Sequence, residues 1–198
     1  MQGYQQEKIW DPVTRLWHWV LMLAVSIGWS FGKYMSFDNV QWHFYLGYLV
    51  LGLMLFRLLW GFIGPSPVRF PALLPTPAGL LTYLRQVGQR KPSGTPGHNP
   101  LGSISVMLML ISITAQAVTG LFIVSDDFFE SGPLASYVSE ATVNRLTWWH
   151  HLNSDFILVL VVLHVGAILF YLLWKKENLV KPMITGWKWV KRNTGKQS

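Results

Sequence analysis

The sequence predicts an all-α integral membrane protein, a bundle of four transmembrane helices with short interfacial helices beside it. Its 198 residues are 51% hydrophobic and only 13% charged, about half of the roughly 25% that soluble domains carry. The chain also contains four long stretches that are almost free of charge, each close to the roughly 20 residues that a helix needs to cross a bilayer. We therefore expect a single membrane domain over residues 1–198.

The expected spans cover residues 16–35, 43–63, 100–124 and 150–174. The third is the clearest, because 27 uncharged residues separate His98 from Asp126. The second carries one charge, Arg57, and ends at Gly64-Pro65, where proline stops a helix. The first lies where a signal peptide would, but it is rich in aromatic residues and lacks a small-residue cleavage pattern. We expect it to be a retained helix.

The basic residues orient these helices. Four spans place the N-terminus, the loop 64–99 and the tail 175–198 on one side, and these regions hold 13 of the 16 Lys and Arg residues. The opposite loop, 125–149, is acidic. By the positive-inside rule both termini are cytoplasmic and this loop is periplasmic, in a bacterial inner membrane. The stretches 78–87 and 182–193 combine apolar and basic residues and are expected on the lipid head groups; a solvated basic tail is the alternative for the second.

The absence of cysteine limits the chemistry. It excludes disulfides, thiolate zinc sites, cysteine-ligated iron–sulfur clusters and covalent c-type haem. A metal would have to be held by His, Met or oxygen ligands. The chain has six histidines, at positions 18, 43, 98, 150, 151 and 164.

Four of the histidines form two pairs by depth. His43 and His150 begin their spans at the outer side. His164 lies 14 residues after His150, about 21 Å deeper at 1.5 Å per residue, which is the level of His18 near the inner end of the first span. Fourteen residues make nearly four full turns, so His150 and His164 share one helix face, whereas His151 points away. Ionisable side chains inside a membrane are functional candidates by default.

Two stacked histidine pairs predict two non-covalent haems b, each held by two imidazoles in an apolar slot between helices. The inner haem takes His18 and His164, and the outer haem takes His43 and His150. Two irons about 20 Å apart along the membrane normal form a path for electrons across the bilayer. Zinc fits less well, because each pair lacks a third protein ligand.

Other residues are candidates to support the haems. Arg15 and Arg57 are suited to neutralise the propionates, with snorkelling to lipid phosphate as the alternative. Glycines on the helices would let a porphyrin approach the backbone, although ordinary packing of small residues explains each of them as well. These glycines are Gly28, Gly32, Gly47 and Gly120.

Five motifs together suggest a family. They are Asp11-Pro-x-x-Arg15-Leu-Trp-His18-Trp, His43-x-x-x-Gly47-Tyr, Arg57-Leu-Leu-Trp-Gly-Phe-x-Gly-Pro, Gly97-His98-Asn99-Pro100-Leu101-Gly102, and His150 with thirteen residues before His164. With these motifs the chain resembles the prokaryotic cytochrome b561 family over residues 9 to about 190. That family includes the b-type cytochrome subunits of nickel-iron hydrogenases and of related formate dehydrogenases. The resemblance implies a bundle of four or five helices that holds two haems b and passes electrons between quinone and a partner.

The same resemblance implies a quinone site. In the formate dehydrogenase relatives an Asn at the head of a helix helps to bind quinone beside the inner haem. Asn99 looks like its counterpart, and His98 would be a proton-exchanging neighbour. Asn99 as the N-cap of the third helix is an alternative that does not exclude this role.

The expected function is electron transfer across the inner membrane, between the quinone pool and a periplasmic partner. This partner is a c-type cytochrome attracted by the acidic outer face or a catalytic redox subunit, so the chain is either a quinone-linked oxidoreductase or the cytochrome b subunit of a larger complex.

One alternative is a stand-alone quinone reductase that oxidises superoxide, although the acidic loop would repel an anion. Another is a proton or ion transporter with a histidine relay, against which stands the lack of paired intramembrane carboxylates. The sequence indicates contact with membrane lipid and none with nucleic acid; a homodimer, the direction of electron flow and the quinone type stay open.

Overall fold

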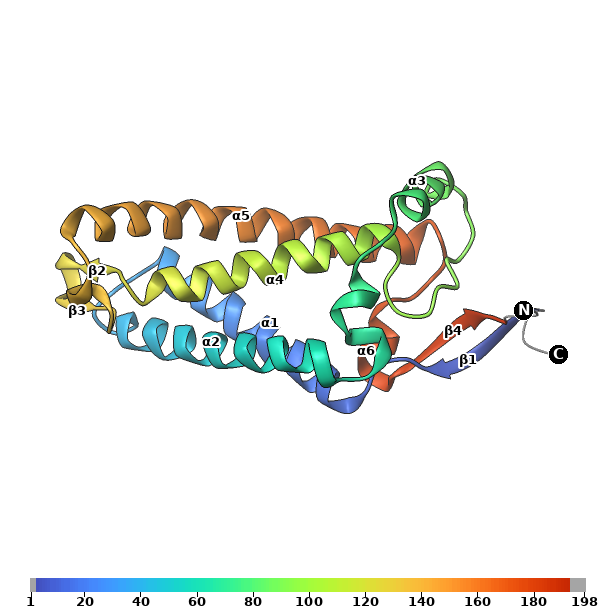
Figure 1. The fold of residues 1–198 in the computed structure, drawn as a ribbon, viewed down its shortest axis with the longest axis horizontal. Helices are drawn as coiled ribbons and strands as arrows, with labels where there is room; N and C mark the ends of the chain where they lie inside the picture. Colours follow the sequence, from blue (N-terminus) through green and yellow to red (C-terminus); the bar gives the residue numbers. More distant parts are fainter. Residues whose placement is uncertain (1–2, 193–198) are drawn as a thin grey trace. The chain divides into compact units, whose positions relative to one another are not determined.

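The computed structural model describes residues 3–192 and is mostly helical (Figure 1). The end of the predicted cytoplasmic tail, residues 193–198, lies outside the described residues. The helices are α1 (Pro12–Lys33), α2 (Val40–Ile63), α3 (Pro77–Gln86), α4 (Pro100–Gly120), α5 (Glu140–Leu173) and α6 (Val180–Thr185). The strands are β1 (Tyr4–Lys8), β2 (Val124–Ser125), β3 (Glu130–Ser131) and β4 (Trp187–Lys191). Short 3-10 turns lie at 66–68, 70–73, 126–128 and 135–137.

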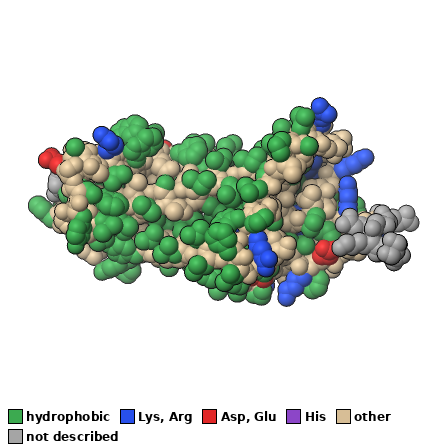
Figure 2. Space-filling view, in the orientation of Figure 1, with side chains coloured by type: hydrophobic (Ala, Val, Ile, Leu, Met, Phe, Trp, Pro, Cys, Tyr) green, Lys and Arg blue, Asp and Glu red, His purple; other side chains and the backbone are tan. Residues whose placement is uncertain are grey.

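Three helices within residues 3–192 are long and apolar enough to cross a membrane: α2, α4 and α5. The first expected span, residues 16–35, corresponds to α1, which has 22 residues but is not among these three helices. Its sequence includes Arg15, His18 and three tryptophans, and these residues lower its mean hydropathy. Many large apolar side chains of the three spans are exposed, as a lipid-facing surface requires, and Figure 2 shows how widely hydrophobic side chains cover the face drawn.

Three helices begin with the same local signal, a capping side chain followed by proline at the first helical position. The three pairs are Asp11-Pro12, Thr76-Pro77 and Asn99-Pro100. Each capping oxygen accepts the backbone N–H three residues later, at 2.9 Å from Thr14, 3.1 Å from Gly79 and 2.8 Å from Gly102. Proline costs nothing there, because its missing N–H would have had no partner in the helix. The sequence thus sets where α1, α3 and α4 start.

α5 begins earlier than the fourth expected span. It starts at Glu140 and runs for 34 residues, so part of the predicted periplasmic loop 125–149 is helical. Ser139 caps this start, since its hydroxyl accepts the Thr142 N–H at 3.4 Å. The negative charge of Glu140 also lies where the helix dipole favours it. A charge-free stretch predicts only the apolar part of a helix. The polar first turns of α5 lie outside that stretch, so the sequence pattern did not predict them.

The prediction of a helix across the Trp- and Lys-rich stretch 182–193 is wrong for residues 187–191. These residues form β4, which pairs with β1 in an antiparallel ladder that matches Gln6 with Trp189 (Figure 1). Lys188 and Val190 are buried whereas Trp187 and Trp189 are exposed. This alternation has the period of two that a strand requires. The interfacial stretch 78–87 is helical, as predicted, and forms α3.

The chain divides into two compact units. Unit 1 contains residues 3–16, 60–107 and 162–192 of the described chain. Its core gathers around β1 and β4, where Ile9, Trp10, Val68 and Val190 are buried together. α3 belongs to this unit and has no buried residue.

Unit 2 contains residues 17–59 and 108–161, and so holds parts of α1, α2, α4 and α5. α1 packs on α2, where the Trp17 indole donates a hydrogen bond of 2.8 Å to the Leu53 carbonyl. α4 meets α5 through Asn153, whose side-chain amide donates to the Ser112 carbonyl at 2.9 Å. The hairpin β2–β3 also belongs to unit 2.

Candidate functional site

Two histidines face each other inside unit 2, His43 near the start of α2 and His150 on α5. Their ring centroids are 6.4 Å apart and their planes are inclined by 77°. A metal ion bound by one nitrogen of each imidazole, at about 2 Å, would hold the two ring centres about 6 Å apart. The structure therefore brings together the residues predicted to bind the outer haem, at a separation that suits a shared iron.

The other ring nitrogen of His43 has a partner. Its Nδ1 lies 2.9 Å from the carbonyl oxygen of Gly28 on α1. A carbonyl oxygen only accepts, so Nδ1 carries the ring proton and Nε2 keeps its lone pair. Metal-binding histidines commonly donate their second N–H to such an oxygen.

His150 is held in a similar way from α4. Its Nδ1 lies 3.1 Å from the hydroxyl of Thr119. The same hydroxyl lies 2.8 Å from the carbonyl of Ala115, one turn earlier in α4. Both rings of the pair are thus oriented through Nδ1.

Two glycines lie directly against these rings. A Cβ at Gly32 would stand 2.8 Å from Cε1 of His43, and a Cβ at Gly120 would stand 3.2 Å from Cε1 of His150. The first distance is shorter than side chains tolerate, so Gly32 makes room for the imidazole itself. The remaining two of the four glycines singled out from the sequence have more open surroundings; they are Gly28 and Gly47.

The inner histidines lie in different units. His18 belongs to α1 within unit 2 and is half-buried, edge-on to Trp19 with ring centroids 5.5 Å apart. His164 belongs to α5 within unit 1 and is also half-buried. Their pairing on an inner haem stays a prediction.

The two arginines predicted to neutralise propionates have different surroundings. Arg57 in unit 2 is buried, 6% exposed, and its guanidinium lies 5.8 Å from the ring centre of Trp17. Burial of its side chain argues against simple snorkelling into the head groups. Arg15 in unit 1 donates to the carbonyl of Ile184. Their contact with propionates stays a prediction.

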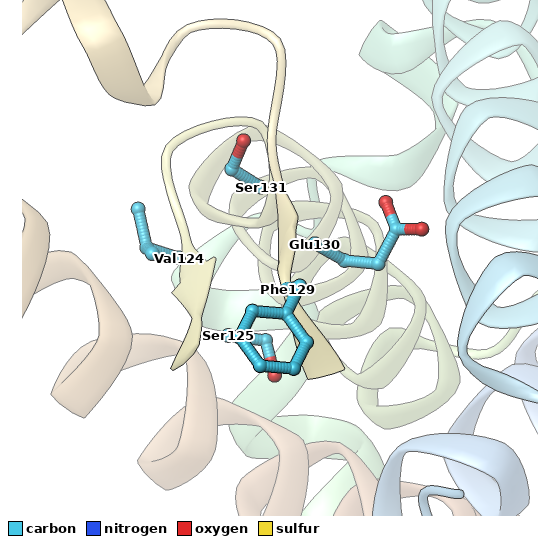
Figure 3. A pocket seen from close by; sticks show the side chains of 5 residues that line it. All are labelled: Val124, Ser125, Phe129, Glu130 and Ser131. Atoms are coloured by element: carbon cyan, nitrogen blue, oxygen red, sulfur yellow. The ribbon is translucent and has the colours of Figure 1, made fainter. Parts of the chain in front are cut away.

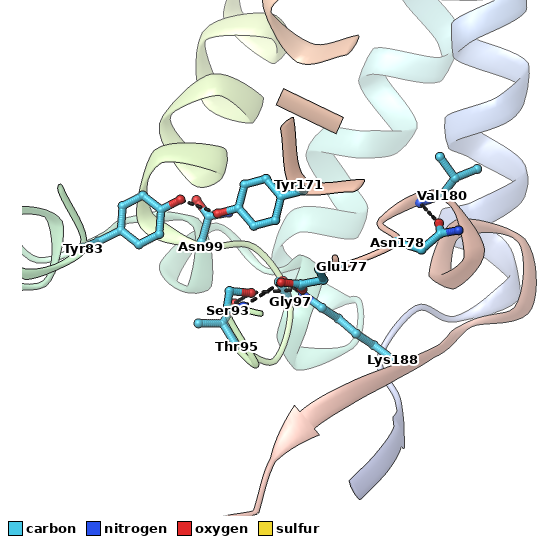
Figure 4. Close-up of polar contacts among 10 residues, drawn as sticks. All are labelled: Tyr83, Ser93, Thr95, Gly97, Asn99, Tyr171, Glu177, Asn178, Val180 and Lys188. Carbon is cyan, nitrogen blue, oxygen red and sulfur yellow. Dashed lines mark hydrogen bonds and ion pairs between the residues drawn. The ribbon is translucent and has the colours of Figure 1, made fainter. Parts of the chain in front are cut away.

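Asn99, the residue predicted to contact quinone, has both ends of its side chain engaged, and Figure 4 shows it beside Tyr171 and Tyr83. Its Oδ1 accepts from the Gly102 N–H at 2.8 Å, which confirms the N-cap interpretation. Its Nδ2 donates to the phenol oxygen of Tyr171 at 2.9 Å, and this hydroxyl is hydrogen-bonded to that of Tyr83 on α3. Sequence reasoning missed both tyrosines, although Tyr171 lies seven residues after His164 and therefore on nearly the same helix face.

A buried ion pair fixes the loop just before Asn99. Lys188 and Glu177 approach to 3.4 Å with side chains only 8% and 10% exposed, and Lys188 also donates to the Gly97 carbonyl at 3.1 Å. Glu177 in turn accepts from the backbone and hydroxyl of Ser93 (Figure 4). Burial lowers the pKa of Lys188, and the charge of Glu177 only partly offsets this. The expectation that Lys188 faces the lipid head groups is wrong.

His98 next to this loop lies against Trp10, with ring centroids 4.9 Å apart and planes inclined by 58°. Both residues belong to unit 1, and Trp10 is part of its core. The contact with Trp10 thus holds the His98 ring against the core around β1 and β4. Its proton-exchanging role stays a prediction.

A shallow hollow lies at the hairpin β2–β3 (Figure 3). Its lining residues are Val124, Ser125, Phe129, Glu130 and Ser131. Phe129 is 89% exposed and has a left-handed backbone with φ of 55°. Glu130 accepts a hydrogen bond from Gln41 of α2, two residues before His43.

Opposed imidazoles on helices of membrane-spanning character define a membrane protein with a two-histidine site suited to haem iron. A model of the family described as prokaryotic cytochrome b561 matches residues 9–186. The chain therefore belongs to the prokaryotic cytochrome b561 family and is a membrane b-type cytochrome, which confirms the resemblance predicted from the motifs.

Named relatives agree with this assignment. The chain is 24% identical to a probable Ni/Fe-hydrogenase B-type cytochrome subunit of Azotobacter chroococcum, over 92% of this chain and 88% of the relative. It is 25% identical to the protein of the same description from Rhizobium leguminosarum, with the same coverage, and 23% identical to that from Azotobacter vinelandii. No solved structure matches the chain.

The family name implies haem b, and the residues of unit 2 fit this group. Each of His43 and His150 has Nδ1 engaged, which leaves Nε2 for a metal. Gly32 keeps the wall of the site free of a side chain beside His43. The indole nitrogen of Trp29, also on α1, is buried and has no hydrogen-bond partner within residues 3–192, so it is a donor available to a bound polar group.

Proposed function

We propose that this chain is a dihaem b-type cytochrome that carries electrons across the bacterial inner membrane, between the quinone pool and a redox partner on the periplasmic side. The partner we favour is the catalytic part of a nickel-iron hydrogenase, because the named relatives are described as its B-type cytochrome subunits. In this role the chain takes electrons from the partner at its outer side and delivers them to quinone at its inner side.

The opposed pair His43 and His150 is the observation that carries this proposal. Haem b supplies one-electron oxidation and reduction at its iron. The protein supplies two imidazoles at a ring separation of 6.4 Å, both oriented through Nδ1. In this role the two imidazoles would hold the group, and the proton on each Nδ1 would stay with its oxygen acceptor.

The inner pair, His18 and His164, extends the path across the membrane. Three helices of spanning character support a membrane location. We include α1 as a fourth span, since its 22 residues extend about 33 Å at 1.5 Å per residue, enough for the roughly 30 Å of hydrocarbon. The excess of Lys and Arg in the termini and in loop 64–99 supports cytoplasmic termini.

Asn99 and Tyr171 are the residues we propose at the quinone end. A quinone carbonyl accepts hydrogen bonds, and the Asn99 amide together with the Tyr171 and Tyr83 hydroxyls forms a cluster of such donors. The α3 helix that contributes Tyr83 has a largely exposed surface with Leu81 and Leu84, as suits a helix at the lipid boundary where quinone diffuses.

The test is a spectrum and a kinetic assay on the purified protein. We expect a dithionite-reduced spectrum with the α-band of haem b and two haems per chain, with one of them lost in His43→Ala. A quinol such as duroquinol should reduce the haems in the wild type, and Asn99→Ala should slow this step with little change in the spectrum. A folded but colourless protein would refute the proposal. Unchanged quinol kinetics in Asn99→Ala would refute the quinone site alone.

The hydrogenase partner needs its own test. In membrane vesicles that contain this chain and the catalytic subunits of a hydrogenase, hydrogen gas should reduce the haems and then quinone. A matched preparation with His43→Ala should keep hydrogen oxidation with a soluble dye and lose quinone reduction. If hydrogen leaves the wild-type haems oxidised, the partner is of another kind.

A further inference from the structure

We propose that Thr119 is a positioning residue for the outer iron site: its hydroxyl accepts the Nδ1 proton of His150 and thereby leaves Nε2 of that ring for the metal. This inference rests on the proposed role of His150 as a haem ligand. It adds a residue on α4, a helix that contributes no ligand of its own.

The direction of the hydrogen bond follows from the protons available. The Thr119 hydroxyl has one proton, and the carbonyl of Ala115 takes it at 2.8 Å, with the Gln116 carbonyl at 3.1 Å as a second acceptor. The oxygen can then only accept from the ring nitrogen of His150 at 3.1 Å. Nδ1 therefore carries the proton, and the lone pair of the neutral imidazole is at Nε2.

The packing of α4 on α5 fixes this contact. Asn153 lies three residues after His150 and donates both to the Gln116 side chain at 2.7 Å and to the Ser112 carbonyl at 2.9 Å. Gln116 lies three residues before Thr119. α4 and α5 thus share a second polar contact, about one helical turn from the Thr119 contact. Inside a membrane such polar side chains hold neighbouring helices in register.

The two rings of the pair differ in the kind of acceptor they use. His43 donates to the backbone carbonyl of Gly28, which no substitution of a side chain removes. His150 lies against the Thr119 side chain as well as the Gln116 backbone, so the Thr119 contact can be removed by mutation. An acceptor on the far nitrogen raises the basicity of an imidazole ligand, and a more basic ligand favours oxidised iron. Loss of the Thr119 hydroxyl should therefore raise the reduction potential of the outer haem.

The experiment compares Thr119→Val, Thr119→Ser and Thr114→Val. Valine keeps the size of threonine and removes the acceptor, whereas serine keeps the hydroxyl. Thr114 is a matched control, because it lies on the same helix, is exposed, and its hydroxyl also donates to the carbonyl four residues earlier, at 2.7 Å from Leu110. Each variant is purified with its haems, and the readouts are a redox titration, the low-spin ferric EPR spectrum and the affinity of the stripped protein for hemin.

We expect Thr119→Val to raise the potential of one haem, change its EPR spectrum and weaken hemin binding at that site by about 10- to 100-fold, the usual effect of losing a partner of a metal-bound histidine. Thr119→Ser and Thr114→Val should match the wild type. The unaltered second haem serves as an internal check of folding. The backbone of Gln116 is a further hydrogen-bond partner of the His150 ring; if that contact alone holds the ring, Thr119→Val will match Thr114→Val and the inference is wrong.

His150→Ala separates this inference from the proposed function. If His150→Ala removes one haem and Thr119→Val changes nothing, His150 is a ligand and only the positioning role is wrong. If His150→Ala keeps both haems with native potentials, the ligand assignment has failed, and the inference fails with it.

Discussion

Replacement of Gly32 by alanine should specifically disturb the His43 side of the outer site. A Cβ at position 32 would stand 2.8 Å from Cε1 of His43, and ordinary contact begins at 3.4 Å, so the ring or α1 must move by the difference of about 0.6 Å. Overpacking of this kind costs about 1–3 kcal/mol. If this strain is released when the haem leaves, hemin affinity at the outer site falls by about 5- to 150-fold, since about 1.4 kcal/mol is tenfold.

Gly28→Ala is the matched control on the same helix. Its added Cβ would meet only the Cβ of Leu46, at an ordinary 3.7 Å, and the carbonyl that holds His43 is retained. Both substitutions favour a helical backbone by the same amount, so a difference between them reflects the ring contact. The assay is hemin titration of the stripped protein together with the haem-to-protein ratio after purification. If Gly32→Ala binds two haems as tightly as Gly28→Ala, the His43 ring does not occupy the observed position when haem is bound.

Three further predictions concern other parts of the chain. His151→Ala should keep both haems and His150→Ala should lose one, because the ring of His150 lies opposite that of His43; haem loss in His151→Ala, seen in the reduced spectrum, would contradict this. Asn153→Leu should lower the free energy of unfolding by about 0.6 kcal/mol for each hydrogen bond lost between membrane helices, as followed by haem absorbance in SDS titrations, and a loss several times larger would show that the polar contact does more than hold the register. Folding lowers the pKa of Lys188 from 10.5. Between the two pKa values the unfolded chain therefore binds more protons, and the free energy of unfolding rises with pH. The stability that comes from neutral Lys188 is fully present above pH 10.5 and is lost as the pH falls through the folded-state pKa. Lys188→Met should remove this pH dependence of stability in thermal unfolding from pH 8 to 11. The variant should also be less stable at every pH, because Glu177 loses the cation that it pairs with. An unchanged pH profile would mean that another group causes the dependence.

Much of the helical structure is determined locally. A capping side chain followed by proline specifies the starts of α1, α3 and α4, because the cap and the missing N–H act within one turn. Long charge-free stretches predict α2, α4 and α5, since a membrane helix needs only a run of apolar residues. The extension of α5 back to Glu140 escaped this approach, because that segment is polar and charge counting reports only the apolar part of a helix.

The strands show where sequence patterns are ambiguous. Residues 187–191 alternate in burial in the structure. Tryptophan and lysine are both amphipathic, so this sequence is compatible with a helix on the membrane surface as well as with a strand. The choice depends on β1, which lies at the opposite end of the sequence and supplies the partner backbone. Lys188 becomes buried through this pairing and meets Glu177 there.

The amino-acid sequence alone predicts the candidate iron ligands: without cysteine the histidines remain, and their spacing along apolar helices selects His43 and His150 as partners by depth. What orients their rings follows from the fold, because the acceptors of their Nδ1 protons, the Gly28 carbonyl and the Thr119 hydroxyl, come from other helices. Depth along a helix follows from a constant rise per residue, whereas the rotation of one helix against another depends on packing between segments far apart in the chain.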